Sequence, residues 1–114
     1  MKRVLISIAA GALLTYTQAA TAQDLAAGKK LYADNCQRCH GNKGQGGIGK
    51  KLVGDAATWE FDLFKRAVMT GVDDAGKPLK PVMPIFGKVG LTKPKGATPT
   101  DADLQSVQAY VKTL

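Results

Sequence analysis

Residues 36–40 read Cys36-Gln37-Arg38-Cys39-His40, and this stretch decides how the rest of the chain must be built. It has the C-x-x-C-H spacing at which a c-type haem is attached. Two thiols three positions apart can each add to one vinyl group of the porphyrin, and the adjacent imidazole can bind the iron from one face. The chain has two cysteines and one histidine, and all three lie in this motif. The sequence therefore predicts one covalent haem c with its iron, held by Cys36, Cys39 and His40.

Other uses of this motif fit the sequence less well. A structural zinc site needs four ligands, and the chain has no further cysteine or histidine to complete the set. A thioredoxin-like dithiol belongs in a βαβ unit, which the sequence does not indicate. A disulfide across so short a loop would stabilise little, because its entropic effect grows with loop length.

The beginning of the chain has the features of a secretory signal peptide. Lys2 and Arg3 precede an apolar run at 4–14, and a polar stretch then ends in Ala20-Thr21-Ala22, an A-x-A cleavage site. The apolar run is too short to span a bilayer comfortably, although an uncleaved anchor is the alternative. We expect a signal peptide over 1–22 and one haem-binding domain over 23–114, exported to the periplasm without stable membrane insertion.

Removal of Lys2 and Arg3 would leave 14 basic and 9 acidic residues, a formal charge of +5 before the haem propionates are counted. The sequence has no nucleic-acid motif and little interleaving of aromatic with basic residues, so we expect no nucleic-acid partner. Basic charge of this kind favours redox protein partners with an acidic docking face. The lysines expected to surround the haem edge lie in loops and are Lys43, Lys50, Lys51, Lys80 and Lys88.

Three segments have the pattern of helices. Asp24 is a candidate N-cap for a helix that begins at Leu25 and runs into the haem motif. A second helix is expected over 58–70, with Thr58 as N-cap and Gly71 just past its end. The third begins with a capping box at Thr100-Asp101-Ala102-Asp103, and its apolar residues recur at helical spacing: Leu104, Val107, Val111 and Leu114.

No segment alternates convincingly as a strand does, so the fold class is all-α. We expect a small helical domain wrapped around one covalent haem. The glycine-rich stretch at 41–49 is expected to be a loop whose backbone passes close to the porphyrin.

The second axial position of the iron has two methionine candidates after the signal peptide, Met69 and Met83. Met69 lies inside the helix expected over 58–70, where a methionine usually packs in the core. Met83 lies in Pro81-Val82-Met83-Pro84, where the prolines stiffen an extended loop and hold a thioether outward at low entropic cost. We therefore predict that His40 and Met83 are the iron ligands.

The chain resembles a bacterial class I c-type cytochrome over essentially all of residues 23–114. The matching features are the haem motif, Met83-Pro84-Ile85-Phe86, and the first and last helices. The resemblance implies a cytochrome c-like fold in which those two helices cross at near right angles through Gly28, Tyr32 and Tyr110. It also implies an aromatic residue near the propionates, for which Trp59 is a candidate, although Trp59 could equally be a core residue.

Two features depart from the pattern of this family. Lys50 stands where the family usually has a proline whose carbonyl accepts a hydrogen bond from the ligand histidine. Lysine keeps a backbone carbonyl, so we expect that bond to His40 Nδ1 to survive. The second departure is a long, lysine-bearing loop over 87–99, which has the character of an insertion.

These features predict an electron carrier rather than an enzyme. A six-coordinate iron has no open site for a substrate, and the sequence contains no arrangement of a nucleophile with a base. Two alternatives remain at this point. The chain could be the stably bound electron-accepting subunit of a periplasmic dehydrogenase, or a haem sensor or gas-binding protein with an open site if Met83 does not bind iron.

Overall fold

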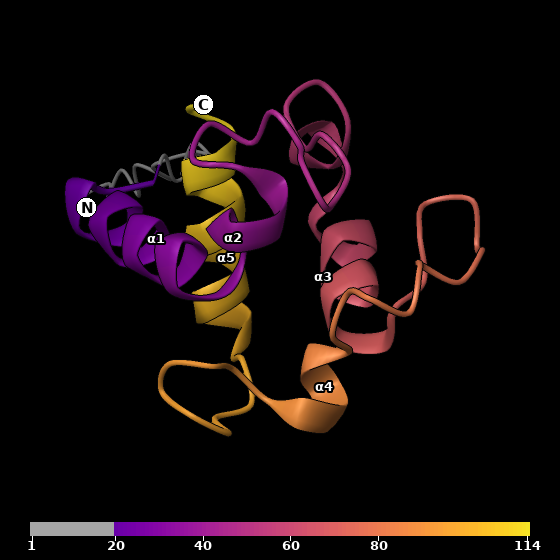
Figure 1. Ribbon diagram of the computed structural model, residues 1–114. Coiled ribbons are helices and arrows are strands. Elements are labelled where there is room, and N and C mark those ends of the chain that lie inside the picture. The colour runs from indigo at the N-terminus through magenta and orange to yellow at the C-terminus, as the bar shows by residue number, and fades with distance from the viewer. Residues whose placement is uncertain (1–19) are drawn as a thin grey trace, which may run out of the picture.

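The computed structural model describes residues 20–114, so most of the predicted signal peptide lies outside the described residues (Figure 1). Within that range the chain is helical and contains no strand, and its β-type pairing is an isolated bridge between Val72 and Pro78. This confirms the all-α fold class. The elements in chain order are α1 (Ala22–Asn35), α2 (Gln37–His40), the 3₁₀ helix η1 (Ala56–Thr58), α3 (Phe61–Thr70), α4 (Phe86–Val89) and α5 (Asp101–Val111).

Helices α1 and α5 cross in direct contact, as the family resemblance implied (Figure 1). A Cβ atom on Gly28 of α1 would lie 2.0 Å from the Ser106 carbonyl oxygen of α5, so only glycine allows this approach. Beside it the rings of Tyr32 and Tyr110 pack at a tilt, with centroids 5.6 Å apart. Tyr32 is fully buried and donates a hydrogen bond of 2.5 Å to the Gly41 carbonyl, which joins the helix crossing to the loop after the haem motif.

The start of α1 differs from the prediction. Thr21, not Asp24, is the N-cap, because the Thr21 hydroxyl accepts from the Asp24 amide while the Asp24 carboxylate accepts from the Thr21 amide. Asp24 is therefore the N3 residue of a capping box and not its N-cap. The predicted capping box of Thr100 and Asp103 at the start of α5 is confirmed.

The helix predicted over 58–70 is shorter than expected, because Thr58 belongs to the preceding 3₁₀ helix η1. The Thr58 hydroxyl donates to the Asp55 carbonyl at 2.7 Å, and the N-cap position of α3 is occupied by Glu60 instead. The chain is extended at Trp59, and α3 begins only at Phe61. At the other end Gly71 has left-handed backbone angles (φ 72°) and terminates α3, as predicted.

The core lies between α1, α3 and α5. Its buried cluster consists of Tyr32, Ala57, Phe64, Leu104, Val107 and Val111. The short helices α2 and α4 were not predicted, because four residues are too few to show a helical period. Within residues 20–114 the structure contains no helix with the length and apolar character needed to cross a membrane.

Candidate haem site

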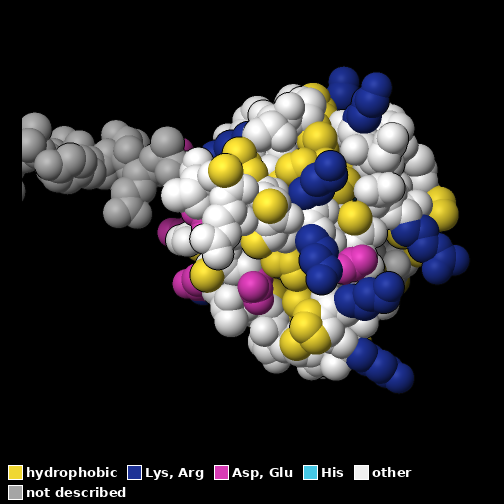
Figure 2. Space-filling view, turned by 90° about the vertical axis from the view of Figure 1, so that its left-hand side faces the viewer, with side chains coloured by type: hydrophobic (Ala, Val, Ile, Leu, Met, Phe, Trp, Pro, Cys, Tyr) yellow, Lys and Arg dark blue, Asp and Glu magenta, His cyan; other side chains and the backbone are white. Residues whose placement is uncertain are grey.

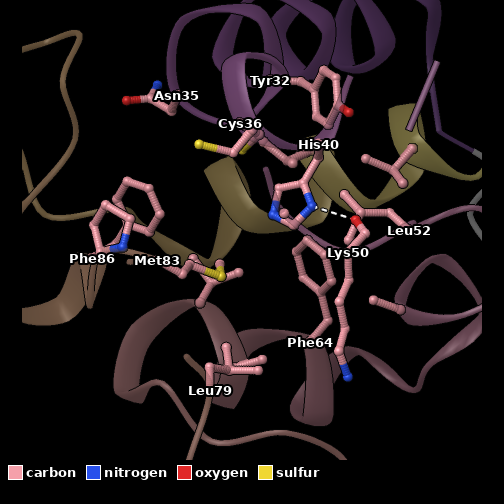
Figure 3. A pocket seen from close by; sticks show the side chains of 18 of the residues that line it. Tyr32, Asn35, Cys36, His40, Lys50, Leu52, Phe64, Leu79, Met83 and Phe86 are labelled. Atoms are coloured by element: carbon pink, nitrogen blue, oxygen red, sulfur yellow. Dashed lines mark hydrogen bonds between the residues drawn. The ribbon is translucent and has the colours of Figure 1, made fainter. Parts of the chain in front are cut away.

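A cavity of about 390 Å³ opens beside the core, between the haem motif, α3 and the loop before α4. This volume lies in the range of about 300–1,000 Å³ that is usual for small-molecule and cofactor sites. All four residues predicted from the sequence line it: Cys36, Cys39, His40 and Met83. Figure 3 labels three of them, Cys36, His40 and Met83. The rest of the wall is mainly apolar and includes Leu31, Phe64, Val68, Leu79, Phe86, Leu91, Leu104 and Val107.

Helix α2 arranges the haem motif at one side of this cavity. The Cys36 amide donates to the Tyr32 carbonyl at 2.8 Å, so the motif continues directly from α1. The His40 amide donates to the Cys36 carbonyl at 3.0 Å, and this single turn brings both thiols and the imidazole to the same wall. Both cysteines are free. Burial, with a smaller effect of Cys39, raises the pKa of the Cys36 thiol to about 12, so it is protonated at neutral pH.

The His40 imidazole is held by the glycine-rich loop. Its Nδ1 lies 2.7 Å from the Lys50 carbonyl oxygen, which confirms the contact predicted for Lys50. Because a carbonyl can only accept, Nδ1 carries the hydrogen, so in the neutral imidazole Nε2 is the nitrogen with the free lone pair. Figure 3 shows the imidazole among the side chains that line the cavity, with its bond to the Lys50 carbonyl as a dashed line beside it.

Gly49 explains how the loop comes so close to the imidazole. A Cβ atom there would lie 2.8 Å from Cε1 and 2.9 Å from Nδ1 of His40, so a side chain would collide with the ring. The Gly49 amide also donates to the Cys39 carbonyl at 2.8 Å. The glycine-rich stretch was predicted to pass the porphyrin, and the structure shows that it packs against the imidazole.

The two methionines have different surroundings. Met83 is half-buried in the loop before α4 and lines the cavity, where Figure 3 shows its side chain pointing inward. Met69 lies on α3 and packs against the core cluster instead. Trp59 also lines the cavity, and its backbone carbonyl accepts a hydrogen bond of 2.8 Å from the buried Gln108 side chain.

Asn35 is a site residue that the sequence reasoning missed. Its Oδ1 accepts from the Thr92 amide at 2.7 Å, and its Nδ2 donates to the carbonyls of Leu31 (3.0 Å) and Lys93 (3.3 Å). It thereby attaches the loop over 87–99 to the end of α1, next to Cys36. The one signal in the sequence was an amide side chain immediately before the motif.

The long loop is an ordered part of the cavity wall. It closes on itself through hydrogen bonds from the Leu91 amide to the Ala97 carbonyl (2.7 Å) and from the Gly96 amide to the Leu91 carbonyl (2.8 Å). The Leu91 side chain is buried and lines the cavity. The segment therefore covers part of the site.

The donor set fits a large apolar group that brings its own metal. Two thiols, an imidazole and a thioether surround an apolar space, whereas the described residues, 20–114, contain no group of three or more His, Cys, Asp or Glu side chains that could hold a free metal ion. A porphyrin supplies four nitrogen ligands itself and needs from the protein only axial donors and an apolar pocket.

Comparisons with known proteins agree with this geometry. A family model described as cytochrome c oxidase, cbb3-type, subunit III matches residues 23–111. Cytochrome c6 of Thermosynechococcus vestitus is 32% identical over 115 residues, and cytochrome c6 of Thermostichus vulcanus is 31% identical over 115 residues; each match covers 97% of this chain and 91% of the relative. Thiosulfate dehydrogenase of Stutzerimonas stutzeri is 34% identical over 94 residues, which is 79% of this chain but 27% of that protein.

The search of solved structures found no match. The family model and the two relatives that match over nearly their whole length confirm the resemblance. The chain belongs to the family of small c-type cytochromes, which are electron carriers rather than enzymes and hold one covalently bound haem c with its iron.

Proposed function

We propose that this protein is a periplasmic electron carrier whose haem is attached through Cys36 and Cys39 and whose iron is bound by His40 and Met83. The observation that carries the proposal is the convergence of these four side chains on one apolar cavity. Met83 is more than forty residues from the motif in the sequence, yet it lines the same cavity as His40, whereas Met69 does not.

The bound haem supplies a one-electron Fe(III)/Fe(II) couple. The protein residues set which oxidation state is favoured. Met83 offers a soft thioether, which favours Fe(II) and raises the reduction potential. The apolar wall acts in the same direction, because burial disfavours the extra positive charge of the oxidised state. His40 is oriented by the Lys50 carbonyl, which holds the hydrogen on Nδ1 and leaves Nε2 free to bind iron.

The proposed location rests on the signal peptide predicted over 1–22. Cleavage after Ala22 would remove Thr21, the N-cap of α1, and leave Gln23 as the first residue. The helix would then depend on its contact with α5 more than on its cap, since caps contribute about 1 kcal/mol and tertiary packing supplies most helix stability.

The proposed partner is a redox protein with an acidic docking face. Lys50, Lys51 and Lys80 line the cavity, and Ile48 and Val82, which also line it, are 69% and 63% exposed. Figure 2 shows basic side chains gathered mainly toward one side of the displayed face, with hydrophobic side chains exposed between them. An apolar patch bordered by lysines can bring a haem edge close to an acidic partner, because charge directs the encounter and apolar contact excludes water.

A second candidate function is a stably bound electron-accepting subunit or domain of a periplasmic dehydrogenase. The match to a segment of thiosulfate dehydrogenase favours it, since that relative is much longer than this chain. Co-purification of a larger chain at constant stoichiometry would support this alternative over a free carrier. An open-site sensor is the third reading, and it requires that Met83 does not bind iron.

The test is to replace Met83 with Ala in the haem-loaded protein. We expect loss of the sulfur-to-iron charge-transfer band, binding of cyanide or carbon monoxide, and a reduction potential lower by roughly 0.2 V, within the range of about 0.8 V that axial ligands span. Met69→Leu is the matched control and should leave band and potential unchanged, because the swap nearly conserves volume. If Met69→Leu loses the band and Met83→Ala keeps it, the proposed ligand is wrong.

A further inference from the structure

The short helix α4 is seated on the end of α3 through a glycine. A Cβ atom on Gly87 would lie 2.4 Å from the carbonyl oxygen and 3.3 Å from the carbonyl carbon of Met69. Gly87 does not have a positive φ, so space and not backbone conformation requires glycine here. The atoms it meets belong to the backbone of a helix and cannot turn aside as a flexible side chain could.

The chain before α4 is attached to the same end of α3 at two further points. The Leu79 amide donates to the Gly71 carbonyl at 2.8 Å. Ile85 packs over Gly71, because a Cβ atom added to Gly71 would lie 3.2 Å from Ile85 Cγ1. The segment 79–87 is therefore held at both ends.

Met83 lies between these attachments, in residues 80–84, which are called the arch below. Its amide donates to the Lys80 carbonyl at 3.1 Å, which closes a tight turn, and Phe86, the first residue of α4, is buried and lines the cavity. The position of the arch relative to α3 thus decides how far the Met83 side chain reaches toward His40.

We propose that Gly87, packed on the Met69 carbonyl, is a positioning residue that sets the reach of the Met83 sulfur to the iron. The inference rests on the proposed ligation by Met83. Met69 takes part through its main chain, and its own thioether is not required. A methyl group at position 87 must push α4 and the attached arch away from α3, so the sulfur–iron contact lengthens or breaks while the haem motif on the opposite wall is untouched.

The experiment compares haem-loaded Gly87→Ala with Gly28→Ala. For Gly87→Ala we expect loss of most of the sulfur-to-iron band and a lower reduction potential. We also expect the cyanide affinity to rise about tenfold, because most of the free-energy cost of overpacking one methyl group would fall on the sulfur–iron bond. Gly28→Ala creates a closer contact, 2.0 Å from Ser106, but on the α1–α5 side. It should lower the denaturation midpoint and leave band and potential of the folded protein unchanged.

Two further variants keep the test decisive. Ile85→Ala loosens the second attachment without adding bulk, and it should weaken the band even if Gly87→Ala does not mature. Met69→Leu retains the carbonyl and should behave as the wild type. The proposal is overturned if Gly87→Ala and Ile85→Ala keep the wild-type band and potential, or if Gly28→Ala weakens the band as much as they do.

Met83→Ala separates the proposed ligation from the proposed positioning role of Gly87. A band that survives Met83→Ala refutes the ligation itself, whereas a band lost in Met83→Ala but kept in Gly87→Ala refutes only the positioning.

Discussion

His40 is oriented by a contact that involves two neighbouring backbone positions. The Lys50 carbonyl accepts the Nδ1 hydrogen at 2.7 Å, and the absence of a side chain on Gly49 lets the loop approach the ring. The lysine in place of the family's usual proline therefore costs no hydrogen bond. A hydrogen-bonded imidazole is a more basic ligand, which stabilises Fe(III).

The first residue-scale prediction is the effect of Gly49→Ala. The added methyl group would lie within 3 Å of Cε1 and Nδ1, so the loop must move and the Lys50 contact must weaken. We expect a loss of stability of about 1–3 kcal/mol, typical of overpacking, and a higher reduction potential because the imidazole becomes a weaker donor.

Denaturant titration and equilibrium redox titration measure these two effects. Gly47→Ala is the matched control in the same loop, since its Cβ would meet only the Cys39 carbonyl oxygen, at 3.3 Å. A potential that falls, or that moves equally in both variants, would contradict the role assigned to this contact.

Among the elements, the loop over 87–99 depends on α1 for its position. Asn35 joins it to α1 through both atoms of its amide, and the loop in turn buries Leu91 against the cavity. A segment that looked like an insertion in the sequence is therefore part of the wall of the site.

The element-scale prediction is that Asn35→Ala releases this loop. Loss of the contacts with Thr92 and Lys93 should destabilise the protein by about 1–2 kcal/mol, since a hydrogen bond contributes roughly 0.5–1.5 kcal/mol. Amide hydrogen exchange at Thr92 should become faster. Asn35→Asp keeps the acceptor and loses the donor, so it should protect the Thr92 amide better than Ala does. Unchanged exchange at Thr92 in Asn35→Ala would show that the loop holds its position without the clamp.

For the molecule as a whole, part of the basic charge lies at the cavity. Of the lysines expected to surround the haem edge, Lys50, Lys51 and Lys80 line the cavity, whereas Lys43 and Lys88 do not. Three of the five lysines expected at the docking face therefore lie at the cavity, and two do not. The surface salt bridge between Lys65 and Asp101 (2.8 Å) lies elsewhere, between α3 and α5, and contributes little to stability.

The prediction at this scale concerns electron transfer with an acidic partner. Second-order rates should fall as ionic strength rises, because salt screens charges beyond a Debye length of about 8 Å at physiological ionic strength. Reversing Lys50, Lys51 and Lys80 to Glu should flatten that dependence. The control reverses Lys29, Lys95 and Lys112 to Glu, and these three lysines do not line the cavity. It changes the net charge by the same amount as the first variant. Equal flattening in both variants would mean that net charge alone, without a docking face, directs the encounter.

The chemistry of the site could be predicted from the sequence alone, because the residues that carry it are neighbours in the chain. The haem motif places two thiols and an imidazole within five residues, and one helical turn is enough to bring them together. The capping box at Thr100 and the glycine that ends α3 are local in the same sense, and both were predicted correctly.

The roles of other residues depend on tertiary contacts. Thr58 is not the predicted cap, because it ends the 3₁₀ helix η1 and α3 begins only at Phe61. Asn35 acquires its role through residues 57 and 58 positions away. Which glycine packs on which carbonyl depends on contacts between segments far apart in the chain, and no local pattern of residues encodes those contacts.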